Sequence, residues 1–234
     1  MNTTADERCN RLVSTWSQAV RQRWAPHLEE VELAVDDLLY EPGVPLRHLF
    51  FPISAVVALV YVMEDGATTE FALVGPEGFV GFPLLIGGDS TPRRAVVQIG
   101  GLAWRVRAEV ARTMLADIKL APPMLRYVEA LVTQMSQTAA CNRHHAITQQ
   151  LSRLLLMLLD RGAGSELPLT HERLARMLGV RREGVTTAAQ ALQRDGLIRC
   201  GRGHVSVLDR PGLEHRACEC YGVVEREYRR LLGD

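Results

Sequence analysis

Two helices and a hairpin are indicated by residues 169–208, which read LTHERLARMLGVRREGVTTAAQALQRDGLIRCGRGHVSVL. Thr170 can act as the N-cap of a helix over residues 171–178, because its hydroxyl can accept a hydrogen bond from a free backbone N–H group of the first turn. Gly179 has the position of the C′ glycine that ends such a helix. A second helix is expected over residues 182–194, so the stretch predicts a helix-turn-helix.

The second of these helices has an apolar face and a face suited to DNA. Val185, Ala188, Ala189 and Leu192 share the inward side, and polar side chains occupy the other. Arginine can pair with guanine, glutamate with cytosine and glutamine with adenine, while a threonine methyl group can contact thymine. The candidate base-reading residues are Arg182, Glu183 and Gln190, assisted by Thr186 and Thr187.

A β-hairpin is expected behind this helix, with a cationic tip at Gly201-Arg202-Gly203. Residues 170–204 contain seven arginines and three acidic residues. A solvated surface helix would also carry mixed charges, but the order of cap, break, second helix and basic hairpin favours DNA binding. The residues expected to contact backbone phosphates are Thr170, Arg181, Arg202 and His204.

Upstream of this module, apolar side chains recur with a heptad spacing. They step by three and four residues along a predicted helix over 123–144, as in the seam of a two-stranded coiled coil with a polar residue at one core position. A core helix packed on the preceding domain explains the spacing too, and we favour a dimer. The candidate interface residues are Leu125, Val128, Val132, Met135, Ala139 and Asn142.

Residues 31–110 have a different sequence pattern, in which short β-rich runs are separated by turn signals such as Asp65-Gly66 and Gly100-Gly101. Strands at this spacing indicate a small antiparallel barrel or roll. A single amphipathic helix is expected before it, over residues 7–24. The chain thus divides into three parts. Residues 1–122 form a β-roll domain with an N-terminal helix, residues 123–144 form the expected dimerisation helix, and residues 145–234 form a DNA-binding domain.

The composition is that of an ordinary globular chain of 234 residues, with 27 Lys+Arg and 27 Asp+Glu. The charge is uneven, because residues 1–142 hold 12 basic and 16 acidic residues and the remainder holds 15 and 11. No apolar run approaches the ~20 residues that span a bilayer, and the polar N-terminus has no signal-peptide core. We expect a cytoplasmic protein without a membrane partner.

The helix-turn-helix and its hairpin resemble the winged helix of Crp/Fnr-type transcription regulators. The similarity rests on LTHERLARMLGVRREGVT at 169–186 and LQRDGLIR at 192–199, with R-E-x-V at 182–185 as its specific part. The resemblance implies an α+β fold: an N-terminal antiparallel β-roll like a cyclic-nucleotide-binding jelly roll, a long dimerisation helix and a C-terminal winged helix-turn-helix. It implies a homodimer on palindromic double-stranded DNA, with RNA polymerase and a small-molecule effector of unknown identity as further partners.

Two positions depart from the family pattern in the DNA-binding module. Arg181 stands where a serine N-cap usually precedes the recognition-helix arginine, and losing such a cap costs about 1 kcal/mol. Thr187 occupies the place of a further arginine one turn later. The outer half of the DNA site is therefore expected to differ from the usual family sequence.

The residues that bind a cyclic nucleotide in the family, the effector cassette, differ more from the family pattern. Cyclic-nucleotide-binding members of the family carry Gly-Glu for the ribose and Arg-Ser for the phosphate, and this chain resembles that cassette at Gly78, Gly81, Arg93 and Arg94. Phe82 replaces the glutamate, so a ribose hydroxyl would lose its acceptor, and Arg94 replaces the serine. We expect a regulator that does not depend on a cyclic nucleotide; an anion bound by the two arginines stays open.

Other functional classes find little support. The five cysteines, Cys9, Cys141, Cys200, Cys218 and Cys220, lack the C-x-x-C spacing of a zinc site, so reduced structural thiols and no metal are expected. The β-rich region has too few histidines for a cupin-like metalloenzyme, and no catalytic motif is present. Haem bound at His144-His145 and a purely structural dimer are the remaining alternatives, and no enzyme or cofactor is predicted.

Overall fold

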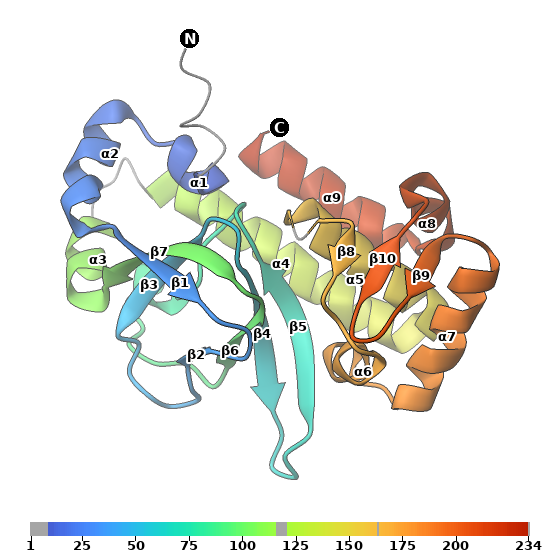
Figure 1. Ribbon diagram of the computed structural model, residues 1–234. Coiled ribbons are helices and arrows are strands. Elements are labelled where there is room, and N and C mark those ends of the chain that lie inside the picture. The colour runs from blue at the N-terminus through green and yellow to red at the C-terminus, as the bar shows by residue number, and fades with distance from the viewer. Residues whose placement is uncertain (1–8, 116–120, 163, 234) are drawn as a thin grey trace.

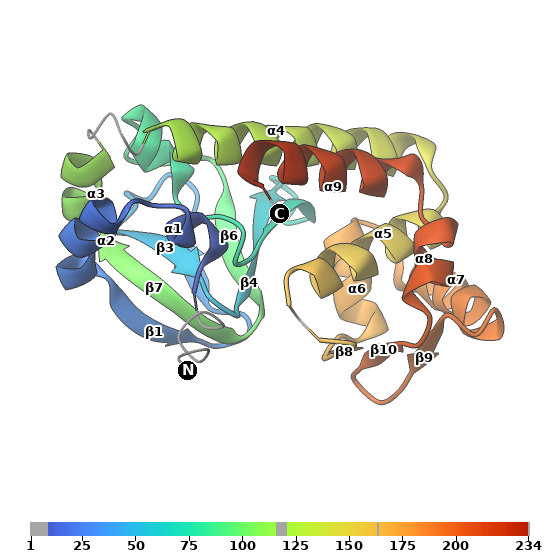
Figure 2. The same ribbon diagram turned by 90° about the horizontal axis from the view of Figure 1, so that it is seen from above.

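The computed structural model describes residues 9–115, 121–162 and 164–233. A β-roll and a winged-helix part lie next to each other, and the long helix α4 (Ala121–His144) runs along one side of both (Figures 1 and 2). Helix α9 (Glu219–Leu232) lies beside α4, so the C-terminal segment returns toward the roll (Figure 2). This is the mixed fold expected from the sequence, with an antiparallel roll, a long helix and a C-terminal helix-turn-helix.

The roll consists of two antiparallel sheets with the strand orders β1-β7-β3 and β2-β6-β4-β5. Its seven strands are β1 (Glu29–Leu33), β2 (Leu38–Tyr40), β3 (His48–Pro52), β4 (Val56–Val62), β5 (Thr68–Val74), β6 (Arg94–Ile99) and β7 (Gly101–Arg107). The Asp65-Gly66 turn closes the β4–β5 hairpin, and Gly66 has a φ of 83°, a value that glycine adopts without a side-chain clash.

Strand β4 is buried on both faces because two hydrophobic cores meet across it. Val57 and Leu59 face the interior of the roll, where Trp24, Phe51 and Phe79 also pack. The alternate residues Val56, Ala58 and Val60 belong to the second core, which contains the winged-helix part. Since successive side chains of a strand point to opposite faces, β4 contributes to both cores, as β5 does through Ala72 and Leu73.

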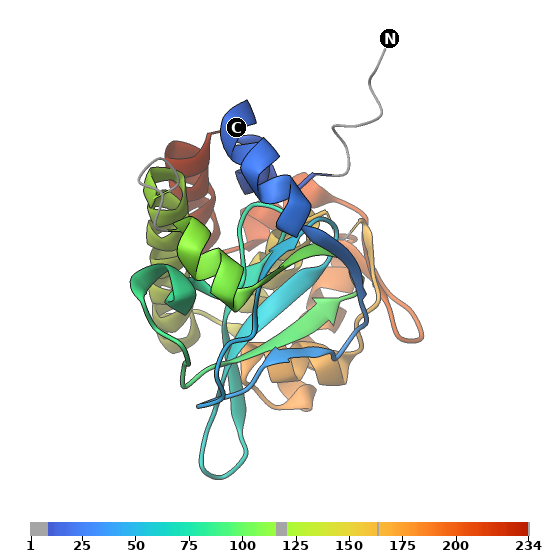
Figure 3. The same cartoon turned by 90° about the vertical axis from the view of Figure 1, so that its left-hand side faces the viewer.

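The prediction of one continuous helix over residues 7–24 is wrong, because the chain forms two helices here. Residues 7 and 8 lie outside the described residues. The chain forms α1 (Arg11–Ser14) and α2 (Gln18–Trp24). The Asn10 side chain caps the first helix, and the Ser17 side chain accepts a hydrogen bond from Val20 N and caps the second. The side chain of Ser17 thus starts a new helix where an apolar period alone predicts a continuous one. Figure 3 shows both helices at the edge of the roll.

The remaining helices pack in one core or the other. Helix α3 (Ala108–Leu115) follows β7, and 3-10 helices cover Ala25–His27 and Phe82–Ile86. Helix α5 (Ile147–Asp160) is buried along most of its length and carries the winged-helix elements. These are β8 (Glu166–Leu167), α6 (His171–Leu178), α7 (Arg182–Arg194), β9 (Ile198–Cys200), β10 (Val205–Val207) and α8 (Arg210–Arg216). Among the described helices none is long and apolar enough to cross a bilayer.

Candidate nucleic-acid interface

The turn between α6 and α7 is built from the local signals seen in the sequence. The Thr170 side chain accepts a hydrogen bond from Arg173 N at 3.1 Å and so caps α6. Gly179 ends that helix with a φ of 65°. Arg181 is the N-cap residue of α7 and makes no capping hydrogen bond through its side chain, so this guanidinium is not used to start the helix.

Helix α7 packs on α5 through a face of small and apolar side chains. Val185, Ala188, Ala189 and Leu192 are buried. At Gly184 a Cβ atom would lie 2.7 Å from Ile147 Cδ1, which is closer than van der Waals contact allows. The glycine at the variable position of R-E-x-V thus leaves room for the Ile147 side chain between α7 and α5, and the four buried side chains define the inward face of α7.

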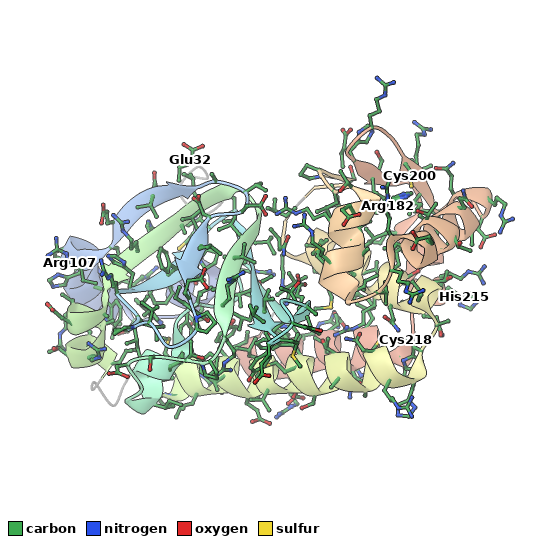
Figure 4. The ribbon with its side chains drawn as sticks, turned by 90° about the horizontal axis from the view of Figure 1, so that it is seen from below. Glu32, Arg107, Arg182, Cys200, His215 and Cys218 are labelled. Carbon is green, nitrogen blue, oxygen red and sulfur yellow. The ribbon has the colours of Figure 1, made fainter. Side chains whose placement is uncertain are left out.

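The predicted base-reading side chains lie on that outward face. Arg182, Glu183, Thr187 and Gln190 are exposed, and Figure 4 shows Arg182 in the winged-helix part, away from the long helix. Thr186 is only half-exposed, and its Oγ1 lies 3.1 Å from His171 Nδ1. Thr186 thus links α6 to α7, while its four neighbours are open to solvent.

The hairpin behind α7 presents its cation at the tip. Arg202 is exposed in the turn between β9 and β10. His204 is half-buried, with Nε2 3.5 Å from Glu166 Oε1 and Nδ1 3.3 Å from the carbonyl oxygen of Arg202. Of the residues predicted to contact phosphates, Thr170, Arg181 and Arg202 are exposed, whereas His204 is engaged with its neighbours.

Helix α6 is held against the roll by a polar chain of contacts. Arg173 pairs with Asp36 at 3.0 Å, and its Nε donates to Gln98 Oε1 at 3.0 Å. Gln98 Nε2 in turn donates to Glu70 Oε2 at 3.3 Å. Burial raises the pKa of Glu70 to about 8. The position of the winged helix relative to the roll therefore depends on a carboxyl group that is buried between them.

Helix α4 has two parallel stripes. One stripe, with Tyr127, Leu131, Gln134 and Cys141, is fully buried in the chain. Each residue of the predicted seam follows a residue of the buried stripe by one position. Leu125 and Val132 are 50% and 43% exposed. Val128 and Met135 are partly buried, and Ala139 and Asn142 are exposed. The stripe that packs internally and the seam are thus different faces of one helix.

In the roll, the predicted effector residues are engaged internally. Gly78 lies against Tyr127, whose ring a Cβ atom at this position would overlap. Arg93 stacks on the Phe82 ring at 4.5 Å and donates through Nε to Thr91 Oγ1 at 2.9 Å, while Arg94 pairs with Glu41 at 2.9 Å. Gly81 adopts a φ of 108° against Leu49. Arg93 thus lies on Phe82, next to Gly81, and both cations of the cassette have partners.

One constellation was not predicted from the sequence. Cys141, His145, Cys218 and Cys220 place their ligand atoms within 4.8 Å of one another. The sulfur atoms of Cys141 and Cys218, 77 residues apart, are separated by 3.5 Å. The only available signal was the pair Cys218-Glu219-Cys220, since nothing local to residue 141 indicates that α9 returns to it.

Two protein-family models match the chain. A cyclic nucleotide-binding domain matches residues 30–117, and a Crp-like helix-turn-helix domain matches residues 149–216. The second match contains α6, α7 and the hairpin, and the first covers all seven strands of the roll except the first residue of β1.

Relatives of known name and structure agree with these matches. The transcriptional regulator SdrP of Thermus thermophilus is 29% identical over 195 residues, covering 81% of this chain and 94% of that protein. The cyclic AMP receptor protein of the same organism is 28% identical over 204 residues, with 81% and 93% covered.

Among solved structures, a CRP-family transcriptional regulator from Thermus thermophilus superimposes with a TM-score of 0.67 at 21% identity, covering 80% of this chain and 96% of the other. SdrP and this solved structure are named as transcriptional regulators, and the matched module is a DNA-binding one. The chain belongs to the Crp/Fnr family of transcription regulators, with a Crp-like helix-turn-helix as its DNA-binding domain.

Proposed function

We propose that this regulator binds double-stranded DNA as a homodimer and reads an inverted-repeat site through α7. The observation that carries the proposal is the outward face of that helix. Arg182, Glu183 and Gln190 are exposed, and each can form hydrogen bonds with the edge of one kind of base. Arg181 and Arg202 flank this face and are suited to phosphates on either side of the major groove.

The partner proposed for the exposed seam of α4 is a second copy of this chain. Leu125 and Val132 are open to solvent although they follow a heptad spacing, and the neighbouring stripe of the same helix is already buried. A parallel pair of such helices would bury the seam with Asn142 as its polar position. Two-fold symmetry then puts two α7 helices into successive major grooves, with half-site centres about 34 Å apart.

DNA binding is proposed not to require a cyclic nucleotide. Phe82 stands where a carboxylate would accept a hydrogen bond from ribose, and it is buried beneath Arg93. Arg94 is paired with Glu41. These residues do not fit a ribose and a cyclic phosphate, because one acceptor is missing and the cations already have partners. Unlike the relative that is named a cyclic AMP receptor protein, this chain is expected to act without that ligand.

Selection of bound sequences from a random DNA pool tests the proposal. The wild-type protein is used with and without cyclic AMP. We expect enrichment of one inverted repeat, identical in both conditions. Enrichment of a motif without symmetry would contradict the dimer, enrichment only with cyclic AMP would contradict effector independence, and no enrichment would contradict sequence-specific binding.

The dimer is tested separately with Val132→Glu, which places like charges across the seam. Sedimentation analysis should show the wild-type protein as a dimer and the variant as a monomer at the same concentration. Thr133→Glu, at a half-buried position on the neighbouring side of the helix, is the matched control and should leave the dimer largely intact. An unaltered dimer for Val132→Glu would place the interface elsewhere.

A further inference from the structure

A cluster of sulfur and nitrogen ligands lies where the long helix meets the C-terminal helix. Cys141 is in the last turn of α4 and His145 follows the end of that helix, while Cys218 and Cys220 stand at the start of α9. Figure 4 shows Cys218 near the end of the long helix, far from Cys200 on the hairpin. We propose that Cys141, His145, Cys218 and Cys220 form a site for a single zinc ion.

The distances fit one tetrahedral ion. With zinc–sulfur bonds of about 2.3 Å, two thiolates on a tetrahedron lie about 3.8 Å apart. The Cys141 and Cys218 sulfur atoms are separated by 3.5 Å, and Cys220 Sγ lies 3.5 Å from His145 Nδ1. In a [2Fe–2S] or [4Fe–4S] cluster the protein ligands are distributed over two or four iron atoms, whereas four ligand atoms within 4.8 Å of one another suit a single ion.

The ligand set selects the class of metal. Three thiolates and one imidazole are a common structural zinc set, and soft sulfur donors disfavour magnesium, calcium and manganese. The cysteines are buried, at 0%, 5% and 2% exposure, and form a small cluster separate from the two large cores. A closed site of four protein ligands suits a structural ion rather than a catalytic one, which keeps a position open for water.

The residues around the cluster supply the outer contacts that such a site needs. His145 turns Nδ1 toward Cys220, and its Nε2 lies 3.3 Å from Glu219 Oε1. A carboxylate on the second ring nitrogen is the usual support for a metal-bound histidine, since it fixes the tautomer and the ring orientation.

The local charge is also balanced. Three thiolates and Zn²⁺ leave one negative charge, which requires compensation in a buried place. Arg153 of α5 is 6% exposed and interacts electrostatically with all three cysteines. Its NH2 group donates to Thr138 Oγ1 at 2.8 Å, and within the described residues its Nε has no hydrogen-bond partner. Cys218 and Cys220 also lie at the N-terminus of α9, where the helix dipole favours thiolates.

The ion would join two segments that are distant in sequence. It would tie the end of α4 to the segment that leaves the winged helix through α8, and so hold α9 against α4. Because binding selects the folded state, zinc is expected to raise the midpoint of thermal unfolding. This readout and the metal content do not depend on whether the protein binds DNA.

The test measures zinc bound to the purified full-length chain. Protein stripped by a chelator is titrated with Zn²⁺ in competition with a chromophoric chelator, and Co²⁺ serves as a spectroscopic probe. We expect one equivalent of zinc per chain, thiolate-to-metal charge-transfer absorption and tetrahedral cobalt bands. Cys218→Ser and His145→Gln should each weaken zinc binding at least tenfold, and Glu219→Gln by about tenfold through the lost support of His145.

Cys200→Ser is the matched control, because Cys200 lies on the hairpin, and it should retain full zinc binding. Circular dichroism of each stripped variant establishes that it is folded, and the wild-type stoichiometry stands even if one variant is not. The proposal is overturned by a wild-type chain that takes up no stoichiometric zinc, by equal affinity in Cys218→Ser, or by a Cys141–Cys218 disulfide in protein purified without metal.

Discussion

The winged helix and the β-roll use their charged side chains in opposite ways. On α7 and its hairpin, Arg182, Glu183 and Arg202 are exposed to solvent. In the roll, Arg93 stacks on Phe82 and Arg94 is paired with Glu41. One region keeps hydrogen-bonding groups available for an external ligand, and the other uses them to hold its own fold. Removing an arginine should therefore impair DNA binding in the first region and stability in the second.

The largest expected effect is on stability, at the buried ion pair that joins the roll to the end of α5. Arg161 Nε lies 2.9 Å from Glu77 Oε1, and both side chains are less than one-tenth exposed. Arg161→Ala leaves the Glu77 charge buried without its partner, and breaking such a pair costs about 3–5 kcal/mol. Chemical denaturation of the variant measures this free energy of unfolding.

Arg11→Ala is the control for that prediction. Arg11 lies 3.8 Å from the same carboxylate, but its side chain is 60% exposed. Exposed pairs contribute about 0–1 kcal/mol, so the control should change stability little. Equal losses in the two variants would mean that burial does not decide the strength of these pairs.

The second prediction concerns pH at the contact between the roll and α6. The pKa of Glu70 is raised from 4.5 to about 8 by burial, against the nearby charges of Arg161, Arg153 and Arg173. The folded state therefore binds a proton more tightly than the unfolded state, and stability falls as pH rises from about 4.5 to about 8. Each pKa unit corresponds to about 1.4 kcal/mol, so the total decrease is a few kcal/mol.

Glu70→Gln should remove that part of the pH dependence and be more stable than the wild type at pH 8. Gln98 can still pair with the amide at this position. Unfolding curves recorded at several pH values measure the effect. A parallel pH dependence in wild type and variant would show that Glu70 is ionised in the folded protein throughout this range.

The sequence predicts the winged helix well because its signals are local. Thr170 marks the start of α6 through its side-chain cap, and Gly179 marks the end through its left-handed backbone. The apolar side of α7 is visible as a period of three and four. The strands of the roll are harder to predict from the sequence. Its edge strand β1 reads EEVEL, where charged residues hide the strand, and it is recognised only through its pairing with β7.

Long-range contacts explain what the sequence does not reveal. The proposed zinc site needs α9 to lie along α4, and no spacing within residues 141–145 indicates it. Helix α9 itself has an apolar stripe that includes Val224 and Tyr228, so the helix could be predicted from the sequence. That this helix packs on α4 could not be predicted from the sequence. The interruption between α1 and α2 depends similarly on one side-chain cap.

The third prediction tests the external use of charge on α7. Arg182→Ala should lose about 1–3 kcal/mol of binding to the selected site, that is, about fivefold to more than a hundredfold, and should reduce preference at one base pair of each half-site. Binding to random DNA should change little, and so should stability. Fluorescence anisotropy with single-base variants of the site measures the discrimination.

Arg226→Ala is the control for this variant, since Arg226 is an exposed arginine on α9. It should bind the site as the wild type does. A loss for Arg182→Ala that is equal on specific and random DNA would assign Arg182 to a phosphate instead of a base.

The smallest expected effect is at the hairpin tip. Arg202→Ala removes one proposed phosphate contact, so it should weaken binding to all DNA sequences alike. The slope of log K against log salt should decrease in magnitude by about one. Titrations at several salt concentrations measure this slope, and an unchanged value would mean that Arg202 makes no phosphate contact.

In the proposed complex, two α7 helices read the major groove as a symmetric pair. Methylation interference on the selected site tests it most directly, because N7 of guanine lies in the major groove and is where Arg182 would bind. We predict that methylation blocks binding at two symmetry-related guanines about one helical turn apart, and that Arg182→Ala is insensitive to both. Binding unaffected by methylation at any guanine, or blocked at one position only, would contradict symmetric reading of the major groove by α7.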